Sequence, residues 1–180
     1  MVLVSVIGLG SPFGDDNAGW RVVEALAASP LAADHGVQLS LTACRTPVGE
    51  LPGLLAAADV AIIVDAVMTG GAPGTVYRFS RPPLSLFTDD HLSSHGMGIR
   101  AVLGLVQALG DLPSRWFVYG IEVASISVSA ATSLCTTRAV ARVKEAIEGD
   151  IDYFFRNDGP PFQPLRGNKK GGREAAKLLL

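Results

Sequence analysis

The stretch VIGLGSPFGDDNAGW, residues 6–20, leads from an apolar strand through a glycine-rich loop into a helix. A strand that enters a helix through glycines is typical of layered α/β domains. Gly8 and Gly10 match the start of the dinucleotide-binding pattern G-x-G-x-x-G, but an aromatic residue occupies the third glycine position. Asp15 and Asp16 follow at the start of the helix, where their negative charge repels a phosphate. The stretch therefore indicates an α/β fold and favours a cation over a nucleotide at this loop.

Beyond this stretch, apolar runs of strand length alternate with segments whose apolar residues recur at helical spacing. This alternation predicts a three-layer α/β/α sandwich with a mostly parallel, mixed sheet of about five strands. Only a short glycine-rich turn separates residues 60–67 from residues 75–80, so we expect these strands to form a hairpin, with the second one antiparallel to the rest. The expected strands are residues 2–7, 37–43, 60–67, 75–80 and 116–121, and the expected helices are residues 17–28, 51–58, 95–109 and 134–147.

Length and charge restrict the domain organisation. The chain has 180 residues, 48% of them hydrophobic, which suits one domain with a substantial core. We expect a single α/β domain over residues 1–155, followed by a flexible, basic tail rich in Pro and Gly over residues 156–180. The tail carries six Lys/Arg against two Asp/Glu, but the net charge of the chain is −2. This balance argues against nucleic acid as the main partner.

Cysteine content and hydropathy indicate the cellular setting. Cys44 and Cys135 are too few for a disulfide framework, and we expect both to be buried thiols. The longest apolar runs are shorter than the roughly 18 residues of a membrane span. The first residues also lack the basic region and cleavage site of a signal peptide. We therefore expect a cytoplasmic protein without a membrane span.

Carboxylates follow two of the expected strands. Asp15 and Asp16 come after the first strand, and Asp65 lies at the end of residues 60–67. Ligands of open α/β sheets bind outside the carboxyl ends of the strands, so these acids are expected at one edge. We expect one of the two neighbouring acids to cap its helix and the other to face the cleft. Burying the carboxylate of Asp65 costs several kcal/mol unless it is paired or bound to a cation, which favours a functional role.

A histidine at the start of the third expected helix completes a candidate metal site. In DDHLSSHGMG, residues 89–98, Ser93 and Ser94 are typical N-cap residues, which places His95 on the helix and His91 in the preceding loop. His91 is then a surface histidine. Two carboxylates, Asp16 and Asp65, and one imidazole, His95, could hold Zn, Ni, Mn or Fe.

At these residues the chain resembles the hydrogenase maturation endopeptidases. These are cytoplasmic proteases that remove a C-terminal peptide from the large subunit of nickel–iron hydrogenase after nickel insertion. The resemblance extends over roughly residues 1–150 and rests on VIGLGSPFGDDNAGWRVVEAL, IIVDAV, APGTV and SSHGMGIRAVLGLVQAL, followed by GIE at 120–122. The sequence departs from the family pattern at Ser11, where Asn is usual, and at Val123, where Pro is common.

The resemblance implies a function and a set of site residues. Asp16, Asp65 and His95 correspond to the family residues that contact the nickel, which arrives with the large-subunit precursor and is not permanently bound. Asp16 or Asp65 would transfer the proton during hydrolysis, and the protein would act as a monomer. The sequence contains neither the G-x-S-x-G elbow nor the H-E-x-x-H motif. The alternatives are an autonomous metal-dependent peptidase, a non-catalytic maturation chaperone and a nucleotide-binding module.

Overall fold

The computed structural model describes residues 2–29, 37–88, 99–126, 131–156 and 178–179. Its main sheet has five strands in the order β2-β1-β3-β6-β4. The first four are parallel, and β4 runs antiparallel to β6. A separate parallel pair joins β5 to β7. The elements are β1 (Val2–Gly8), η1 (Gly14–Asn17), α1 (Ala18–Ala27), β2 (Val37–Ala43), α2 (Pro47–Ala56), β3 (Val60–Val67), β4 (Val76–Ser80), η3 (Leu84–Leu86), β5 (Phe87–Thr88), α3 (Ile99–Leu109), β6 (Arg115–Glu122), α4 (Leu134–Arg156) and β7 (Leu178–Leu179).

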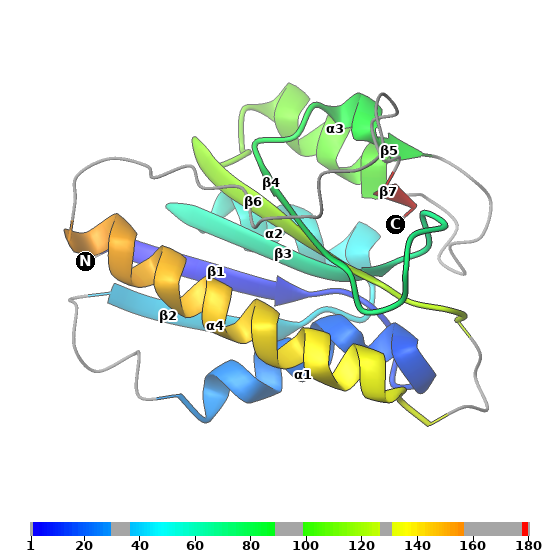
Figure 1. The fold of residues 1–180 in the computed structure, drawn as a ribbon. Coiled ribbons are helices and arrows are strands. Elements are labelled where there is room, and N and C mark those ends of the chain that lie inside the picture. The colour runs from blue at the N-terminus through cyan, green and yellow to red at the C-terminus, as the bar shows by residue number, and fades with distance from the viewer. Residues whose placement is uncertain (1, 30–36, 89–98, 127–130, 157–177, 180) are drawn as a thin grey trace, which may run out of the picture.

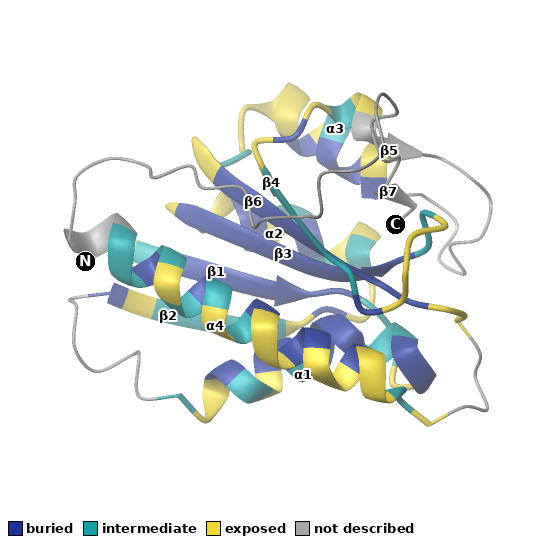
Figure 2. Ribbon diagram, viewed as in Figure 1, coloured by how far each residue is buried: buried dark blue, intermediate teal, exposed yellow. Residues whose placement is uncertain are grey.

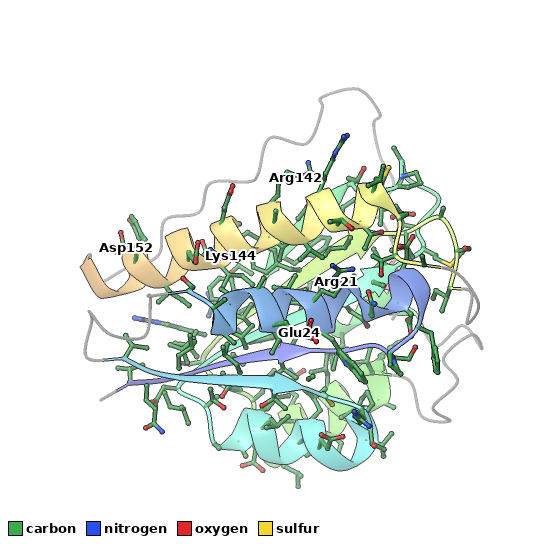
Figure 3. All side chains as sticks on the ribbon, turned by 90° about the horizontal axis from the view of Figure 1, so that it is seen from below. Arg21, Glu24, Arg142, Lys144 and Asp152 are labelled. Carbon is green, nitrogen blue, oxygen red and sulfur yellow. The ribbon has the colours of Figure 1, made fainter. Side chains whose placement is uncertain are left out.

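Helices cover both faces of the main sheet, as Figure 1 shows. α1 and α4 lie side by side on one face, where Arg21 and Glu24 mark α1 and Arg142 and Lys144 mark α4 in Figure 3. α2 and α3 cover the other face, and each face has its own apolar core. The predicted three-layer α/β/α sandwich is confirmed. No helix within the described ranges is both long enough and apolar enough to cross a membrane.

β3 is the central strand that its continuous apolar sequence predicts. All eight of its residues are buried (Figure 2). Ile62 and Val64 pack into the core beneath α1 and α4, whereas Ile63 and Val67 pack into the core beneath α2 and α3. A strand with apolar residues on both faces needs cover on both sides, and the two helical layers provide it.

The predicted hairpin between β3 and β4 is wrong, although β4 is antiparallel as predicted. β6 lies between the two strands and pairs with both. The β3–β4 loop (residues 68–75) therefore passes the end of β6. Seven of the eight residues of β6 are buried, whereas all residues of β4 are at least partly exposed. The apolar β6 therefore gains more from an inner position, and the more polar β4 suits the edge of the sheet.

Other boundaries differ from the predictions at helix ends. α2 begins four residues earlier than predicted, with Pro at its first turn and with Glu50 accepting hydrogen bonds from the N–H groups of Arg45 and Thr46. α4 continues to Arg156, and the tail predicted beyond residue 155 lies mostly outside the described residues. Cys44 is buried as predicted, but the prediction for Cys135 is wrong, because this residue lies on the exposed side of the first turn of α4.

An ion pair fastens α4 to the edge of the sheet. Arg78 of β4 donates from Nε and Nη2 to the two carboxylate oxygens of Asp150, at 2.9 and 2.8 Å. The hydroxyl of Tyr119 donates to the same carboxylate at 2.6 Å. The guanidinium also lies 5.2 Å from the ring centre of Phe117. The side chain of Arg78 is 6% exposed, so this pair is nearly buried.

Asp150→Ala is expected to lower the free energy of unfolding by about 3 kcal/mol, because the variant leaves the Arg78 guanidinium buried without its partner. Urea denaturation measures this loss. Glu145→Ala changes an exposed carboxylate on the same helix and is expected to alter stability by less than about 0.5 kcal/mol. Equal losses in the two variants would contradict a stabilising role for the ion pair.

Candidate functional site

The loop after β1 carries the acidic residues to the carboxyl ends of β1 and β3. The N–H of Leu9 donates to the carbonyl of Val64 at 2.8 Å, so the two segments remain paired just beyond the end of β1. α1 lies very close to the end of β1 and the start of this loop. A Cβ at Gly8 would collide with the backbone of Gly19, and a Cβ at Gly19 would collide with the backbone of Leu9. η1, which holds both acids, consequently contacts α1 and β3.

Asp15 has a structural role, but it does not cap its own helix. Neither η1 nor α1, both within the described residues, has a side-chain hydrogen bond at its N-cap. The carboxylate of Asp15 instead accepts the backbone N–H of Ser133 at 2.6 Å, just before α4 begins. The hydroxyl of Ser133 accepts the N–H of Thr136, and Thr132 donates to the carbonyl of Gly14. The predicted helix cap is wrong, and Asp15 joins two loops at the same edge.

Asp65 is the buried acid at the end of β3. It is 8% exposed, and one carboxylate oxygen accepts the N–H of Ala66 at 2.8 Å. Burial and the negative charge of Asp16 raise the pKa of Asp65 well above its usual value, against the opposing effect of the bond from Ala66. Asp16 is half-buried and lies close enough to act on this carboxyl group. Two of the predicted ligands, Asp16 and Asp65, therefore influence each other electrostatically at this edge.

The charge of Asp65 also acts on the thiol of Cys44, which directly follows β2. Burial, with smaller contributions from the charges of Glu50 and Asp65, raises the pKa of the Cys44 thiol to about 11. Cys44 is therefore a neutral thiol near neutral pH and no nucleophile. Its carbonyl accepts the indole N–H of Trp20 at 3.2 Å, and the guanidinium of Arg45 lies 5.2 Å from the Trp20 ring centre.

The third predicted ligand, His95, lies outside the described residues, as does His91. The described part of α3 begins at Ile99, within the helix predicted for residues 95–109. Among the described side chains, no three His, Cys, Asp or Glu residues gather as a metal site. The role of His95 stays a prediction.

Sequence reasoning assigned no role to three residues around this edge: Thr132, Ser133 and Glu122, the last of which is part of the GIE stretch of the resemblance. The first two sit in a polar segment that the sequence marks only by its small residues, although Ser133 with Thr136 forms an N-cap pattern. Glu122 is 1% exposed, and its carboxylate accepts hydrogen bonds from the β3–β4 loop. A charged residue at the end of an otherwise apolar strand was the available signal.

Gly10→Ala is expected to lower the free energy of unfolding by about 1–3 kcal/mol and to displace Asp16. Gly10 has a φ of +131°, and a Cβ there would collide with the carbonyl oxygen of Asp16. The matched control is Gly53→Ala in α2, where a Cβ would meet nothing within 4 Å. Because alanine favours a helix over glycine by about 1 kcal/mol, the control is expected to stabilise the protein. Urea denaturation of both variants separates the effects, and a stable Gly10→Ala variant would contradict the loop geometry.

Comparison with known proteins agrees with this architecture. A family model for hydrogenase maturation proteases matches residues 42–150. A hydrogenase 2 maturation protease of Escherichia coli (strain K12) is 32% identical over 122 residues, covering 66% of this chain and 71% of the relative. The hydrogenase expression/formation protein HupD of Thiocapsa roseopersicina is 27% identical over 153 residues, covering 84% of this chain and 67% of the relative.

Solved structures show the same fold. The hydrogenase maturating endopeptidase HybD from E. coli aligns with a TM-score of 0.70 and 22% identity, covering 88% of this chain and all of that one. The maturation protease HycI from Thermococcus kodakarensis aligns with a TM-score of 0.60 and 22% identity, covering 84% of this chain and 92% of that one. The family match spans more than half of the chain and includes β3 with Asp65. The chain therefore belongs to the hydrogenase maturation protease family and is a peptidase.

Proposed function

We propose that this protein removes the C-terminal extension of a nickel–iron hydrogenase large-subunit precursor after nickel insertion. In this proposal Asp16, Asp65 and His95 recognise the nickel that the precursor carries, so the metal belongs to the substrate. The observation that carries the proposal is the buried carboxyl of Asp65 beside the charge of Asp16 at the end of the central strand. Two such carboxyl groups gain stability when a cation or a shared proton compensates their repulsion.

The two acids suit complementary steps of peptide hydrolysis. Asp65 keeps its proton to a higher pH than an ordinary aspartate, because burial and the Asp16 charge disfavour its ionised form. A protonated carboxyl can donate to the departing amine, and an ionised one can accept a proton from the attacking water. The precursor's nickel would polarise the scissile carbonyl or the water. Cleavage would then depend on metal already present in the substrate.

The test is to incubate the purified protein with large-subunit precursor in nickel-loaded and nickel-free forms. Mass spectrometry is expected to show a shortened large subunit only with the loaded precursor. If the loaded precursor keeps its full length, the proposal fails for that substrate. A stable complex without shortening would indicate a chaperone, and cleavage of short peptides with a stoichiometric metal would indicate an autonomous peptidase. Stabilisation by nucleotide in a melting assay would indicate a nucleotide-binding module.

The proposed setting is the cytoplasm, where the protein acts as a monomer on the folded precursor. Sedimentation of the purified protein measures the oligomeric state, and a dimer would overturn this part of the proposal.

A further inference from the structure

Glu122, the last residue of β6, holds the β3–β4 loop by its side chain and by its backbone. Its Oε1 accepts the N–H groups of Thr69 and Gly71 at 2.8 and 3.0 Å, and its Oε2 accepts the Thr69 hydroxyl at 2.7 Å. Its own N–H donates to the carbonyl of Thr75 at 2.9 Å, and its carbonyl accepts the N–H of Gly74 at 2.7 Å. One residue thus fixes the loop near both ends.

Neighbouring groups hold the loop from two further sides. The Thr69 hydroxyl lies 3.1 Å from the hydroxyl of Tyr77, and a Cβ at Gly71 would collide with that same hydroxyl. Arg142 of α4, labelled in Figure 3, donates to the carbonyl of Gly74. The loop is therefore a constrained segment, even though residues 70–73 are exposed.

The loop lies beside the candidate site. β3 and β6 are paired so that Asp65 faces Gly120 and Val67 faces Glu122, and the loop begins directly after Val67. Asp65, two residues before the end of β3, and Glu122, the last residue of β6, thus lie on adjacent strands at the same edge of the sheet. Burying a carboxylate is costly, and the charge-assisted bonds to the loop offset that cost. The buried carboxylate of Glu122 therefore holds an exposed loop in place next to Asp65.

We propose that Glu122 is a positioning residue that holds the β3–β4 loop as one wall of the edge where the precursor peptide binds. This inference rests on the proposed function. Glu122 acts through the loop and does not touch the substrate, since its carboxylate is buried and occupied by the loop's donors. Loss of its bonds should weaken precursor binding more than it slows the chemical step.

An isosteric amide separates positioning from an acid role. In Glu122→Gln, Oε1 can still accept both backbone N–H groups, and the amide nitrogen can donate to the Thr69 hydroxyl. That hydroxyl can in turn donate to Tyr77 at its present distance of 3.1 Å. The amide therefore preserves every contact with the loop and removes only the charge. Glu122→Gln is expected to keep kcat and KM within about twofold of the original values.

The decisive measurement compares Glu122→Ala with Glu122→Gln in the precursor-processing assay. Glu122→Ala is expected to raise KM for the loaded precursor about tenfold and to change kcat by less than about threefold. Thr69→Val, which removes one donor, is expected to raise KM about threefold and serves if the alanine variant does not fold. Kinetics are recorded well below the melting temperature of each variant, so that a stability change alone leaves KM unaltered.

Two results would overturn the inference. Unchanged KM in folded Glu122→Ala, or in Thr69→Val if the alanine variant does not fold, would show that the loop only stabilises the fold. A folded but inactive Glu122→Gln would show that the charge itself is needed. Both results require that the original protein cuts the precursor, so they are distinct from failure of the proposed function, in which the original protein leaves it whole.

Discussion

Asp16→Asn is expected to slow cleavage of the nickel-loaded precursor by about a hundredfold or more, the usual contribution of an acid or base group to catalysis. Stability is expected to rise slightly, because the amide removes the negative charge that disfavours ionised Asp65. Asp16 is half-buried, and its charge acts on the carboxyl of Asp65. The amide keeps the size of the side chain but replaces the carboxylate that would bind the nickel or accept a proton. Mass spectrometry of the processed subunit over time measures the loss.

Asp15→Asn is the matched control, one residue away. Asp15 accepts a hydrogen bond from the N–H of Ser133, and the carbonyl oxygen of asparagine can accept the same bond. We expect cleavage to stay within about threefold of the original rate and stability to fall by about 1 kcal/mol, because the bond loses its charge. If Asp15→Asn were inactive and Asp16→Asn active, the roles assigned to the two acids would be reversed.

The strands of the sheet could largely be predicted from the sequence, because their signals are local. The bounds of β2 and β3 match the predicted ranges, β1 is one residue longer at its end, and β6 is one residue longer at each end. The largely apolar sequences of β1, β3 and β6 are a consequence of burial between two helical layers, whereas the edge strand β2 mixes apolar and polar residues. The neighbour of β4 could not be predicted in this way. That neighbour is β6, which begins 35 residues after β4 ends. Because β6 is apolar on both faces, it takes the place between β3 and β4 in the sheet.

The candidate site was predictable in part for the same reason. The acid at the end of β3 follows from the sequence, because a carboxylate that ends a buried strand must lie at the ligand-binding edge. The division of roles between Asp15 and Asp16 depends on Ser133, which is 118 residues away from Asp15. Likewise, the loop donors that occupy Glu122 lie more than 50 residues before it. Local patterns do not show such contacts.

Asp65→Asn is expected to abolish cleavage and to make the protein more stable at neutral pH. The folded protein raises the pKa of Asp65 by burial and by the charge of Asp16, so ionised Asp65 opposes folding. In the unfolded chain the group titrates near about pH 3.9. At pH values below that, Asp65 is protonated in both states and the cost is absent. As the pH rises above this value, Asp65 loses its proton in the unfolded chain before it does so in the folded protein. The folded state is therefore progressively destabilised until the pH passes the pKa of Asp65 in the folded protein.

The asparagine variant removes this cost and can keep the hydrogen bond from the N–H of Ala66. Its stability advantage over the original protein should therefore be small near about pH 4 and should grow towards about pH 7. Urea denaturation of both proteins across this range measures the difference. An advantage that is independent of pH, or that shrinks as the pH rises, would contradict a raised pKa at Asp65. An active variant would contradict its role in the site. A variant that is more stable and inactive would mean that the fold accepts a destabilising carboxyl group because the reaction needs it.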